Sequence, residues 1–347
     1  MRSFLSGRFN YCIYKEKKQM KFIITSENAG KTIKEFLLRD MAFSGGLLKS
    51  LKARENGITV NGEHKTVRYT LSEGDVLVLA DEDREEDTSP YITPSDIPIG
   101  IAYEDDHVTV ADKPYAMPAH PSFSHRDDTV ANALAYRYSS APYVFRPVNR
   151  LDGDTSGLMI TANNRLAAVK LGRAMIAGTI GKMYIAILKN APPEEYGVID
   201  RHMKRAADSI ITRRIAEECE EGARRAVTVY KKVYTNEKTG ECAVIATPVT
   251  GRTHQLRVHF TSLGCPLIGD SLYDIADGRI CRHALHAAYT SFPHPADGKT
   301  VHVYSPIPKD MRALLGEEVS LLCERALREE ENGKLRRMYE EMKKTVK

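Results

Sequence analysis

An acidic and proline-rich segment divides this chain of 347 residues into two unequal parts. The run Asp81–Asp87 contains six carboxylates and one arginine, and three prolines follow it, at Pro90, Pro94 and Pro98. Residues 81–110 carry a formal charge of −9, although the whole chain carries only +4. Segments with this much charge and proline are typically solvated connections between domains. We therefore predict a solvated linker at residues 81–99, with a separate domain on each side.

Residues 21–80, before the linker, show patterns of a small α+β domain. Apolar residues recur at helical spacing in residues 30–40 and 44–54, which predicts two short amphipathic helices. Two strand-like runs follow, Ile58–Val60 and Asp75–Leu79, and the first is followed by an Asn61-Gly62 turn. Over about 60 residues this order of elements resembles the RNA-binding domain named after ribosomal protein S4. The alternative is a small α+β module that binds nothing.

Residues 100–315 are rich in strand patterns and poor in helices. Only two clear helices are expected, one capped by Asp128 and running to Tyr138, the other capped by Asn163 and running to about Ala177. A regular alternation of strands and helices is absent, as is a glycine-rich phosphate loop, which disfavours a parallel nucleotide-binding fold. We predict an α+β domain built on a mixed, largely antiparallel sheet.

The two ends of the chain are rich in charged residues. Residues 1–20 are predicted to be a disordered extension, since the recognisable domain begins at Met20 and no secretory signal pattern is present. Residues 316–347 are rich in charged helix formers of both signs, which favours a solvated surface helix. No stretch is apolar enough for a membrane span. We expect a cytoplasmic protein that acts as a monomer.

Cysteine usage gives no sign of a disulfide framework or a zinc site. The six cysteines are scattered and include no C-x-x-C pair: Cys12, Cys219, Cys242, Cys265, Cys281 and Cys323. We predict reduced thiols, and neither a metal nor a nucleotide cofactor.

Two polar segments stand out as candidates for chemistry. Residues 150–157 (RLDGDTSG) place a carboxylate beside an arginine just before an apolar strand. An Asp-Gly-Asp turn is often structural, and the further carboxylates of a calcium loop are missing. Residues 251–259 (GRTHQLRVH) gather two arginines, two histidines and an amide, and as a helix would place Arg252, Leu256 and His259 on one face. Two histidines five apart do not match the zinc helix H-E-x-x-H.

Six motifs taken together identify a family. They are Asp112-Lys113-Pro114, Arg150-Leu151-Asp152-x-x-Thr155-Ser156-Gly157, Lys182-x-Tyr184-x-Ala186, Gly251-Arg252-Thr253-His254-Gln255-Leu256-Arg257-x-His259, Gly269-Asp270-x-x-Tyr273 and His283-Ala284-Leu285-His286-Ala287. In this order, from about residue 100 to 310, they closely resemble the RluA-type RNA pseudouridine synthase family, in which an S4-like domain is a common companion. The resemblance implies the pseudouridine synthase fold for residues 100–315.

The resemblance also implies an activity and a set of catalytic residues. The family detaches uracil from the ribose carbon C1′ and rejoins it through C5, with no metal or cofactor. Asp152 matches the essential carboxylate, which either attacks C1′ or assists loss of a ribose proton, and both roles need its ionised form. Arg252 is expected to pair with Asp152. Tyr184 matches the tyrosine that stacks on the target base.

Other residues are expected to hold the RNA. Arg150 matches a residue that can fill the gap left by a flipped base, Leu256 would form the apolar floor of the pocket, and Arg257 would bind substrate. Phosphate contacts are predicted for basic residues of both domains, namely Lys49, Lys52 and Arg54, then Arg201, Lys204, Arg205, Arg213, Arg214, Arg224 and Arg225. The acidic linker should be repelled from RNA.

One departure and two rival functions stay open. The family usually has histidine where this chain has Asn149, which puts local packing, rate or substrate range in doubt, and an inactive paralogue is an alternative. One rival is a non-catalytic RNA-binding or ribosome-assembly protein. The other is a hydrolase that uses Asp152 with His254 or His259. Among substrates, uridine in ribosomal RNA is the leading expectation and transfer RNA the second.

Overall fold

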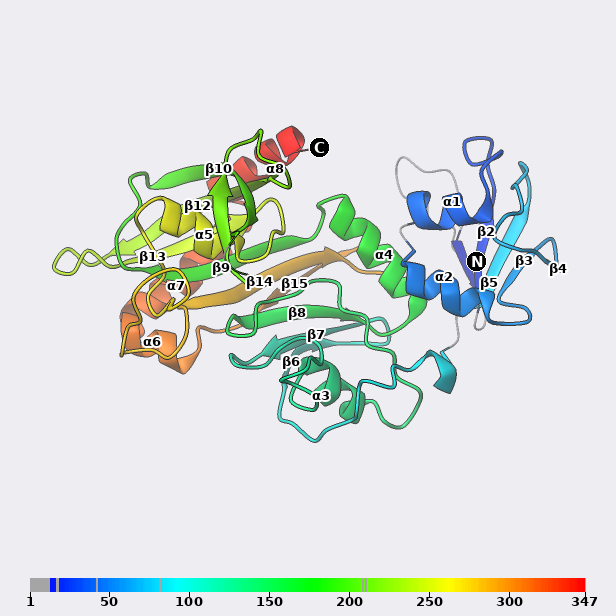
Figure 1. The fold of residues 1–347 in the computed structure, drawn as a ribbon, viewed down its shortest axis with the longest axis horizontal. Coiled ribbons are helices and arrows are strands. Elements are labelled where there is room, and N and C mark those ends of the chain that lie inside the picture. Colours follow the sequence, from blue (N-terminus) through cyan, green and yellow to red (C-terminus); the bar gives the residue numbers. More distant parts are fainter. Residues whose placement is uncertain are drawn as a thin grey trace.

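The computed structural model describes residues 13–16, 19–41, 43–80, 83–207, 209 and 211–346. Within these residues the chain forms a small N-terminal domain and a larger domain, which we call the sheet domain (Figure 1). The segment that starts with the acidic run connects them. None of the helices described has the length and apolar content needed to cross a membrane.

The N-terminal domain is a five-stranded antiparallel sheet covered by short helices. Its elements are β1 (Ile13–Glu16), β2 (Gln19–Ile23), α1 (Ile33–Glu35), the π-helical turn η1 (Phe36–Asp40), α2 (Gly45–Lys52), β3 (Ile58–Val60), β4 (Glu63–His64) and β5 (Val76–Ala80). The strand order is β1-β2-β5-β3-β4. Thr32 and Ser44 cap the two helices through their side-chain oxygens, and Glu35 completes a capping box with Thr32.

The expected helices, strands and turn of this domain are confirmed in place. The Asn61-Gly62 turn lies between β3 and β4, and both of its residues have a positive φ, as a tight hairpin turn requires. The predicted disordered extension is wrong for residues 13–16 and 19–20, because β1 pairs with β2. Residues 1–12 and 17–18 of that extension lie outside the described residues.

The sheet domain is built on ten strands, in agreement with the predicted α+β class. They are β6 (Gly100–Glu104), β7 (Val108–Lys113), β8 (Ser156–Ala162), β9 (Gly181–Leu188), β10 (Tyr196–Arg205), β11 (Arg213–Ala216), β12 (Arg224–Thr235), β13 (Cys242–Pro248), β14 (Leu285–Pro293) and β15 (Thr300–Tyr304). Their order is β11-β10-β12-β13-β9-β14-β8-β7-β6, and β15 pairs with β14. All the pairs are antiparallel except β14 with β8.

The parallel contact between β8 and β14 depends on Gly157. This residue has φ 108°, and a Cβ atom placed there would lie 2.3 Å from the carbonyl oxygen of Ala287. Any side chain would force the two strands apart, so glycine is required. The loop of residues 150–155 therefore enters the centre of the sheet at a fixed position.

Helices cover both faces of the sheet. They are α3 (Val130–Arg137), α4 (Arg165–Ile176), α5 (Gln255–Ser262), α6 (Lys309–Leu315), α7 (Glu317–Glu330) and α8 (Lys334–Val346). The N-caps of α3 and α4 are Thr129 and Asn164, one residue after the predicted Asp128 and Asn163. In both cases the true cap offers its oxygen to the backbone N–H three residues on.

The C-terminal segment is not a solvated helix, and that prediction is wrong. It forms α7 and α8, whose apolar stripes include Leu327, Leu335 and Tyr339, all buried in the same hydrophobic cluster as Ile185 and Ile245 of the sheet. Most of its charged residues lie on the more exposed faces, as in other amphipathic helices, and the buried Glu330 pairs with Lys231 of β12.

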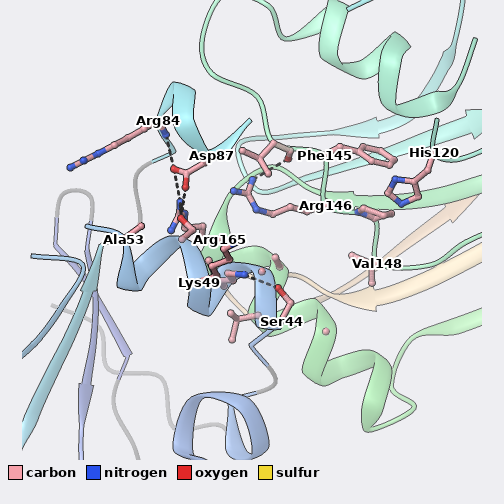
Figure 2. Close-up of a pocket in the computed structure, with 18 of the residues that line it drawn as sticks. Ser44, Lys49, Ala53, Arg84, Asp87, His120, Phe145, Arg146, Val148 and Arg165 are labelled. Carbon is pink, nitrogen blue, oxygen red and sulfur yellow. Dashed lines mark hydrogen bonds and ion pairs between the residues drawn. The ribbon is translucent and has the colours of Figure 1, made fainter. Parts of the chain in front are cut away.

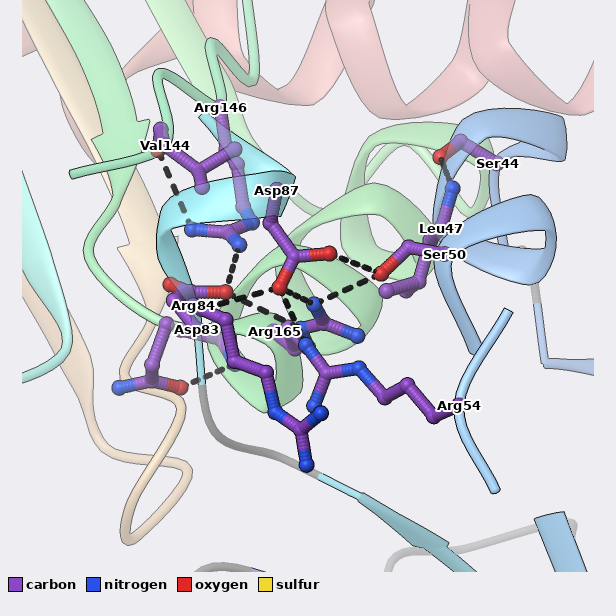
Figure 3. Close-up of polar contacts among 12 residues, drawn as sticks. Ser44, Leu47, Ser50, Arg54, Asp83, Arg84, Asp87, Val144, Arg146 and Arg165 are labelled. Carbon is purple, nitrogen blue, oxygen red and sulfur yellow. Dashed lines mark hydrogen bonds and ion pairs between the residues drawn. The ribbon is translucent and has the colours of Figure 1, made fainter. Parts of the chain in front are cut away.

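The linker is not solvated at two of its acidic residues, Asp83 and Asp87, which are partly buried at the contact between the two domains. Asp83 accepts a hydrogen bond from Arg165 Nε at 3.0 Å and pairs with Arg146, and both arginines belong to the sheet domain. Asp87 pairs with Arg165 Nη2 at 2.7 Å, with Arg54 after α2, and accepts a hydrogen bond from Ser50 of α2 (Figures 2 and 3). We call these six side chains the interdomain cluster: Ser50, Arg54, Asp83, Asp87, Arg146 and Arg165.

Apolar contacts join the same two surfaces. Leu166 and Val169 of α4 are buried in the hydrophobic core of the N-terminal domain. The helix that carries Arg165 is therefore shared by both domains. The acidic linker closes this interface, because Asp83 and Asp87 neutralise arginines that the interface buries.

We expect Asp87→Asn to weaken the docking of the N-terminal domain. The variant removes the charge that compensates Arg54 and Arg165, and breaking a buried ion pair on one side costs about 3–5 kcal/mol. Urea unfolding should show that loss in the free energy of unfolding. The exposed neighbour Glu85 is the matched control, since Glu85→Gln should change it by less than about 0.5 kcal/mol. Equal stability of both variants would contradict the role of the cluster.

The stability given by Asp87 should also depend on pH. Burial opposes ionisation of Asp87, but hydrogen bonds from Ser50 and the Arg84 N–H, with the charges of Arg165 and Arg54, outweigh it and lower its pKa. The stabilisation is therefore complete above the unfolded value of about 3.9 and is lost as the pH falls through the lower folded value. The difference between the wild type and Asp87→Asn should shrink in that range.

Candidate active site

A cleft of about 760 Å³ gathers the candidate residues of the sheet domain. All six of those predicted for catalysis or substrate contact in this domain line it: Arg150, Asp152, Tyr184, Arg252, Leu256 and Arg257. They come from the loop before β8, from β9, from α5 and, for Arg252, from the loop before α5. Among the described residues that line the cleft, Asp152 is the only carboxylate.

The loop that carries Asp152 is held by hydrogen bonds on several sides. Lys113 Nζ donates to the carbonyl of Gly153 at 2.7 Å, and Arg282 Nη1 donates to that of Asp154 at 3.2 Å. The hydroxyl of Thr155 lies 2.8 Å from His283 Nε2. The carboxylate of Asp152 is thus carried on a backbone whose position is fixed by neighbouring strands and loops.

Lys113 is the most deeply buried member of this support. Its side chain is 1% exposed, and Nζ donates to three carbonyls, those of Pro114, Met117 and Gly153. Burial lowers its pKa to about 7, against the opposing charges of Asp154 and Asp152. The sequence showed this lysine only as part of a motif, and its role as a support for the Asp152 loop was not predicted.

Asn149 holds the other end of the same loop. Its side chain accepts a hydrogen bond from the N–H of Ile160 at 2.7 Å and donates to the carbonyl of Leu158 at 3.3 Å. Both partners belong to β8. The amide therefore satisfies two backbone groups of that strand, one donor and one acceptor, and ties the residue before Arg150 to the sheet.

The cation nearest to Asp152 is Arg257, and the prediction of Arg252 as its partner is wrong. Arg257 Nη1 lies 3.7 Å from Asp152 Oδ2, and His254 Nε2 lies 3.9 Å from the same oxygen. Arg252 Nε instead donates to the carbonyl of Arg225. The reason is the start of α5: the helix begins at Gln255, so Arg252 precedes it and does not share the predicted face.

Arg257 lines the cleft and belongs to a buried ion pair. It is 6% exposed and forms two hydrogen bonds to Asp270, at 2.6 and 2.7 Å, while its guanidinium lies 5.0 Å from the centre of the Tyr273 ring. A guanidinium group held by two parallel hydrogen bonds keeps its orientation. Its remaining N–H group therefore faces Asp152 from a fixed position.

His254 occupies a strained backbone position at the edge of the cleft. Its φ of 58° lies in the left-handed region, which is unfavourable for a residue with a Cβ atom. The ring is held by Tyr273, whose hydroxyl lies 2.7 Å from Nδ1. Burial lowers the pKa of His254, with Asp152 opposing the shift. The other histidine of the motif, His259, is fully buried beside Thr228 and does not line the cleft.

Tyr184 and Leu256 form an apolar wall. Both are buried and belong to one hydrophobic cluster with Leu151. Burial, with the nearby charge of Asp152, raises the pKa of Tyr184, so its phenol stays protonated at neutral pH. A tyrosine with a protonated hydroxyl, beside a carboxylate, offers both an apolar ring face and a hydrogen-bond donor.

The predicted phosphate contacts separate into different groups. Arg54 is largely buried in the interdomain cluster, whereas Lys49 and Lys52 are exposed on α2. In the sheet domain three predicted contacts are engaged in ion pairs: Arg225 with Asp200, and both Arg214 and Lys204 with Glu220. Arg150 is exposed at the mouth of the cleft.

The described residues offer no obvious metal site. No group of three or more histidine, cysteine, aspartate or glutamate side chains among them is placed to hold an ion.

Comparison with known proteins gives consistent matches. The family model of RNA pseudouridylate synthases matches residues 107–262. An uncharacterized RNA pseudouridine synthase of Bacillus subtilis, YjbO, is 34% identical over 83% of this chain and 99% of its own length. The ribosomal large subunit pseudouridine synthase D of Pseudomonas aeruginosa is 32% identical over 76% of this chain and 84% of its own. The structure of human RNA pseudouridylate synthase domain containing 1 is 28% identical and covers 62% of this chain and 87% of its own, with a TM-score of 0.51.

We expect Lys113→Met to destabilise the protein by an amount that depends on pH. Between about pH 7 and 10.4 the unfolded chain binds a proton at this lysine that the folded chain does not. Stability contributed by Lys113 therefore rises with pH across this window, by about 1.4 kcal/mol per unit. Urea unfolding from pH 7.5 to 9.5 should show a growing loss in the variant.

The exposed Lys299 provides the control, since Lys299→Met should have an effect below about 0.5 kcal/mol at each pH. A loss at Lys113→Met that stays constant with pH would mean that the three carbonyls keep the ammonium charged.

Proposed function

The chain belongs to the RluA-type RNA pseudouridine synthase family and is an isomerase that forms pseudouridine in RNA, and on this premise we propose that Asp152 is its essential carboxylate. The observation that carries the proposal is that Asp152 alone among the described carboxylates lines the cleft. Both chemical roles considered for it, attack on C1′ and removal of a ribose proton, need an ionised and accessible oxygen. The side chain is 29% exposed, which satisfies the second condition.

The isomerisation exchanges one bond to ribose for another. The bond from N1 to C1′ breaks, uracil rotates, and a bond from C5 to C1′ forms, after which C5 loses its proton and N1 gains one. Neither C1′ nor C5 can react while the base is stacked and paired, so the uridine has to leave its stack. A cleft with a carboxylate, an apolar wall and flanking cations is suited to such a flipped nucleotide.

Arg257 is proposed to position Asp152. The guanidinium nitrogen Nη1, 3.7 Å from Asp152 Oδ2, attracts the carboxylate and limits its rotation. Asp270 is proposed as the group that keeps Arg257 in place, since it holds the other side of the fork in a buried pair. This replaces Arg252 in the role expected from the sequence.

Tyr184 is proposed to face the uracil ring. Its ring and Leu256 offer the apolar surface on which a flipped base can stack, while the protonated phenol can donate a hydrogen bond. Arg150, exposed at the mouth, is proposed to fill the gap in the RNA stack. Arg252 lines the cleft without pairing to Asp152 and is proposed to bind RNA.

The RNA class is proposed from relatives. Several similar proteins are named ribosomal large subunit pseudouridine synthase D, which supports ribosomal RNA as the substrate ahead of transfer RNA. The N-terminal domain is proposed to be an S4-like RNA-binding domain, on the order of its elements. A monomer working in the cytoplasm remains our expectation.

We expect Asp152→Asn to abolish pseudouridine formation. The amide is neither a nucleophile nor a base, so the rate should fall by about 10⁴-fold or more. Transcripts of ribosomal RNA carrying tritium at uridine C5 would report the reaction, because the hydrogen at C5 is released to water. The control is Asp154→Asn, which changes the exposed carboxylate two residues on and should keep the rate within about threefold. Normal release by Asp152→Asn would refute the proposal.

Substitution of the two arginines should separate positioning from binding. Arg257→Lys keeps the charge but loses the fork that spans Asp152 and Asp270, so kcat should fall by about 10- to 100-fold. Arg252→Met should raise KM several-fold and leave kcat close to wild type, as expected when a uniform binding contact is lost. The opposite split would restore Arg252 as the partner of the carboxylate. Circular dichroism would confirm that both variants fold.

A further inference from the structure

A second, larger cleft lies between the two domains. It has a volume of about 1110 Å³ and is bounded by α2 on one side and by residues 144–148 with α4 on the other (Figure 2). Pockets for one drug-sized ligand usually measure about 300–1,000 Å³, so this cleft has room for an extended ligand. The interdomain cluster and the apolar contacts of Leu166 and Val169 hold the N-terminal domain against α4 beside this cleft.

The interdomain cleft is continuous with the candidate active site. The two share four lining residues, His120, Pro147, Val148 and Met175. Pro147 and Val148 directly precede the loop that carries Arg150 and Asp152. An extended ligand that leaves the active-site cleft along this wall therefore enters the interdomain cleft.

The lining of the interdomain cleft has an excess of positive charge. Five basic residues line it, against one acidic residue, Asp87: the five are Lys49, Arg54, Arg84, Arg146 and Arg165. Asp83 compensates a further charge through its pairs with Arg146 and Arg165. The remaining charge attracts an anionic ligand.

Two buried guanidiniums also keep donors that no described residue satisfies. Arg54 is 7% exposed and Arg165 is fully buried, and the Nη1 atom of each has no hydrogen-bond partner within the described chain. Burial and the neighbouring Arg165 lower the pKa of Arg54, which reflects the same surplus of positive charge. Buried donors without partners are rare in native proteins, and an anion beside them would compensate the charge.

The junction of the two clefts offers a surface for a base. His120 is exposed and meets Phe145 edge to face, with ring centres 4.9 Å apart (Figure 2). Aromatic rings beside a basic groove are the combination by which proteins hold single-stranded RNA, since every base can stack and every nucleotide carries a phosphate.

We propose that the interdomain cleft binds the single strand of RNA that flanks the target uridine, with a base on His120 and its phosphates toward Lys49 and the Arg146–Arg165 side of the cleft. The inference rests on the proposed function, because it assumes that the uridine enters the cleft of Asp152. It assigns Lys49 to RNA, and it makes the N-terminal domain one wall of the substrate site.

The test compares binding of short and extended RNA. Fluorescence anisotropy would give the Kd of a ribosomal RNA hairpin and of the same hairpin with single-stranded extensions at both ends, over a range of KCl concentrations. The proteins are the full-length wild type, the double variant Lys49→Ala/His120→Ala, and Lys34→Ala. Lys34 is exposed on α1 and does not line the cleft, so it controls for loss of one lysine from the same domain.

The wild type and Lys34→Ala should bind the extended RNA about 10-fold or more tightly than the hairpin alone, given about 1–3 kcal/mol per stacked base. The double variant should lose that preference. For the double variant, the slope of log Kd against log salt concentration should fall by about 0.7, because one phosphate contact is lost. An unchanged preference in the double variant would overturn the inference.

Inorganic phosphate distinguishes the source of the anion. If millimolar phosphate competes with both RNAs equally and the extensions add no affinity, the cleft binds a small anion only, and the inference is wrong. Tritium release measured with the same proteins tests the proposed function separately. Absence of product in the wild type would count against that function, whereas the anisotropy comparison decides the inference whether or not product forms.

Discussion

The arrangement of the two domains depends on one buried cation, Arg165. It is the first residue of α4, where the helix dipole disfavours positive charge, and its side chain has no exposed surface. Such a charge is tolerated only with close anionic partners, and here Asp83 and Asp87 of the linker provide them. Asp87 also accepts hydrogen bonds from Ser50 and Arg54, so a single carboxylate connects the linker, α2 and α4.

The candidate active site uses the same physical arrangement. Arg257 is buried, and Asp270 compensates its charge through two hydrogen bonds. Because this pair is already formed inside the protein, the remaining N–H group can face Asp152 without a further cost of ordering the arginine. In both places carboxylates fix a buried arginine, Asp270 for Arg257 and the pair Asp83 and Asp87 for Arg165. Each arginine leaves part of its charge for a neighbour, which is Asp152 in one case and the interdomain cleft in the other.

Local patterns were enough to predict most elements of the fold and the members of the site. The strand Ile58–Val60 with its Asn-Gly turn and the strand around Tyr184 depend on neighbours in sequence, which is the information that periodicity and turn chemistry carry. Motifs in register placed Asp152, Tyr184 and Leu256 in one cleft. The pairing of charges was less accessible. Arg252 and Arg257 are the same residue type in the same short segment, so the sequence does not distinguish them. Only the start of α5 at Gln255 decides which of them lies near the carboxylate of Asp152.

The linker shows why net charge alone could not predict its structure. A total of −9 over residues 81–110 describes repulsion among the acidic residues, but it contains no information on which cations the fold brings near them. Asp83 and Asp87 are four residues apart, and the short helical turn at Glu85–Asp87 lets both reach Arg165, more than seventy residues later in the chain. The same composition that predicts a solvated tether can therefore form an interface, provided that buried arginines on both sides need compensation. Because this interface also forms the interdomain cleft, an acidic segment that alone would repel RNA instead holds the basic surfaces of two domains in one continuous site.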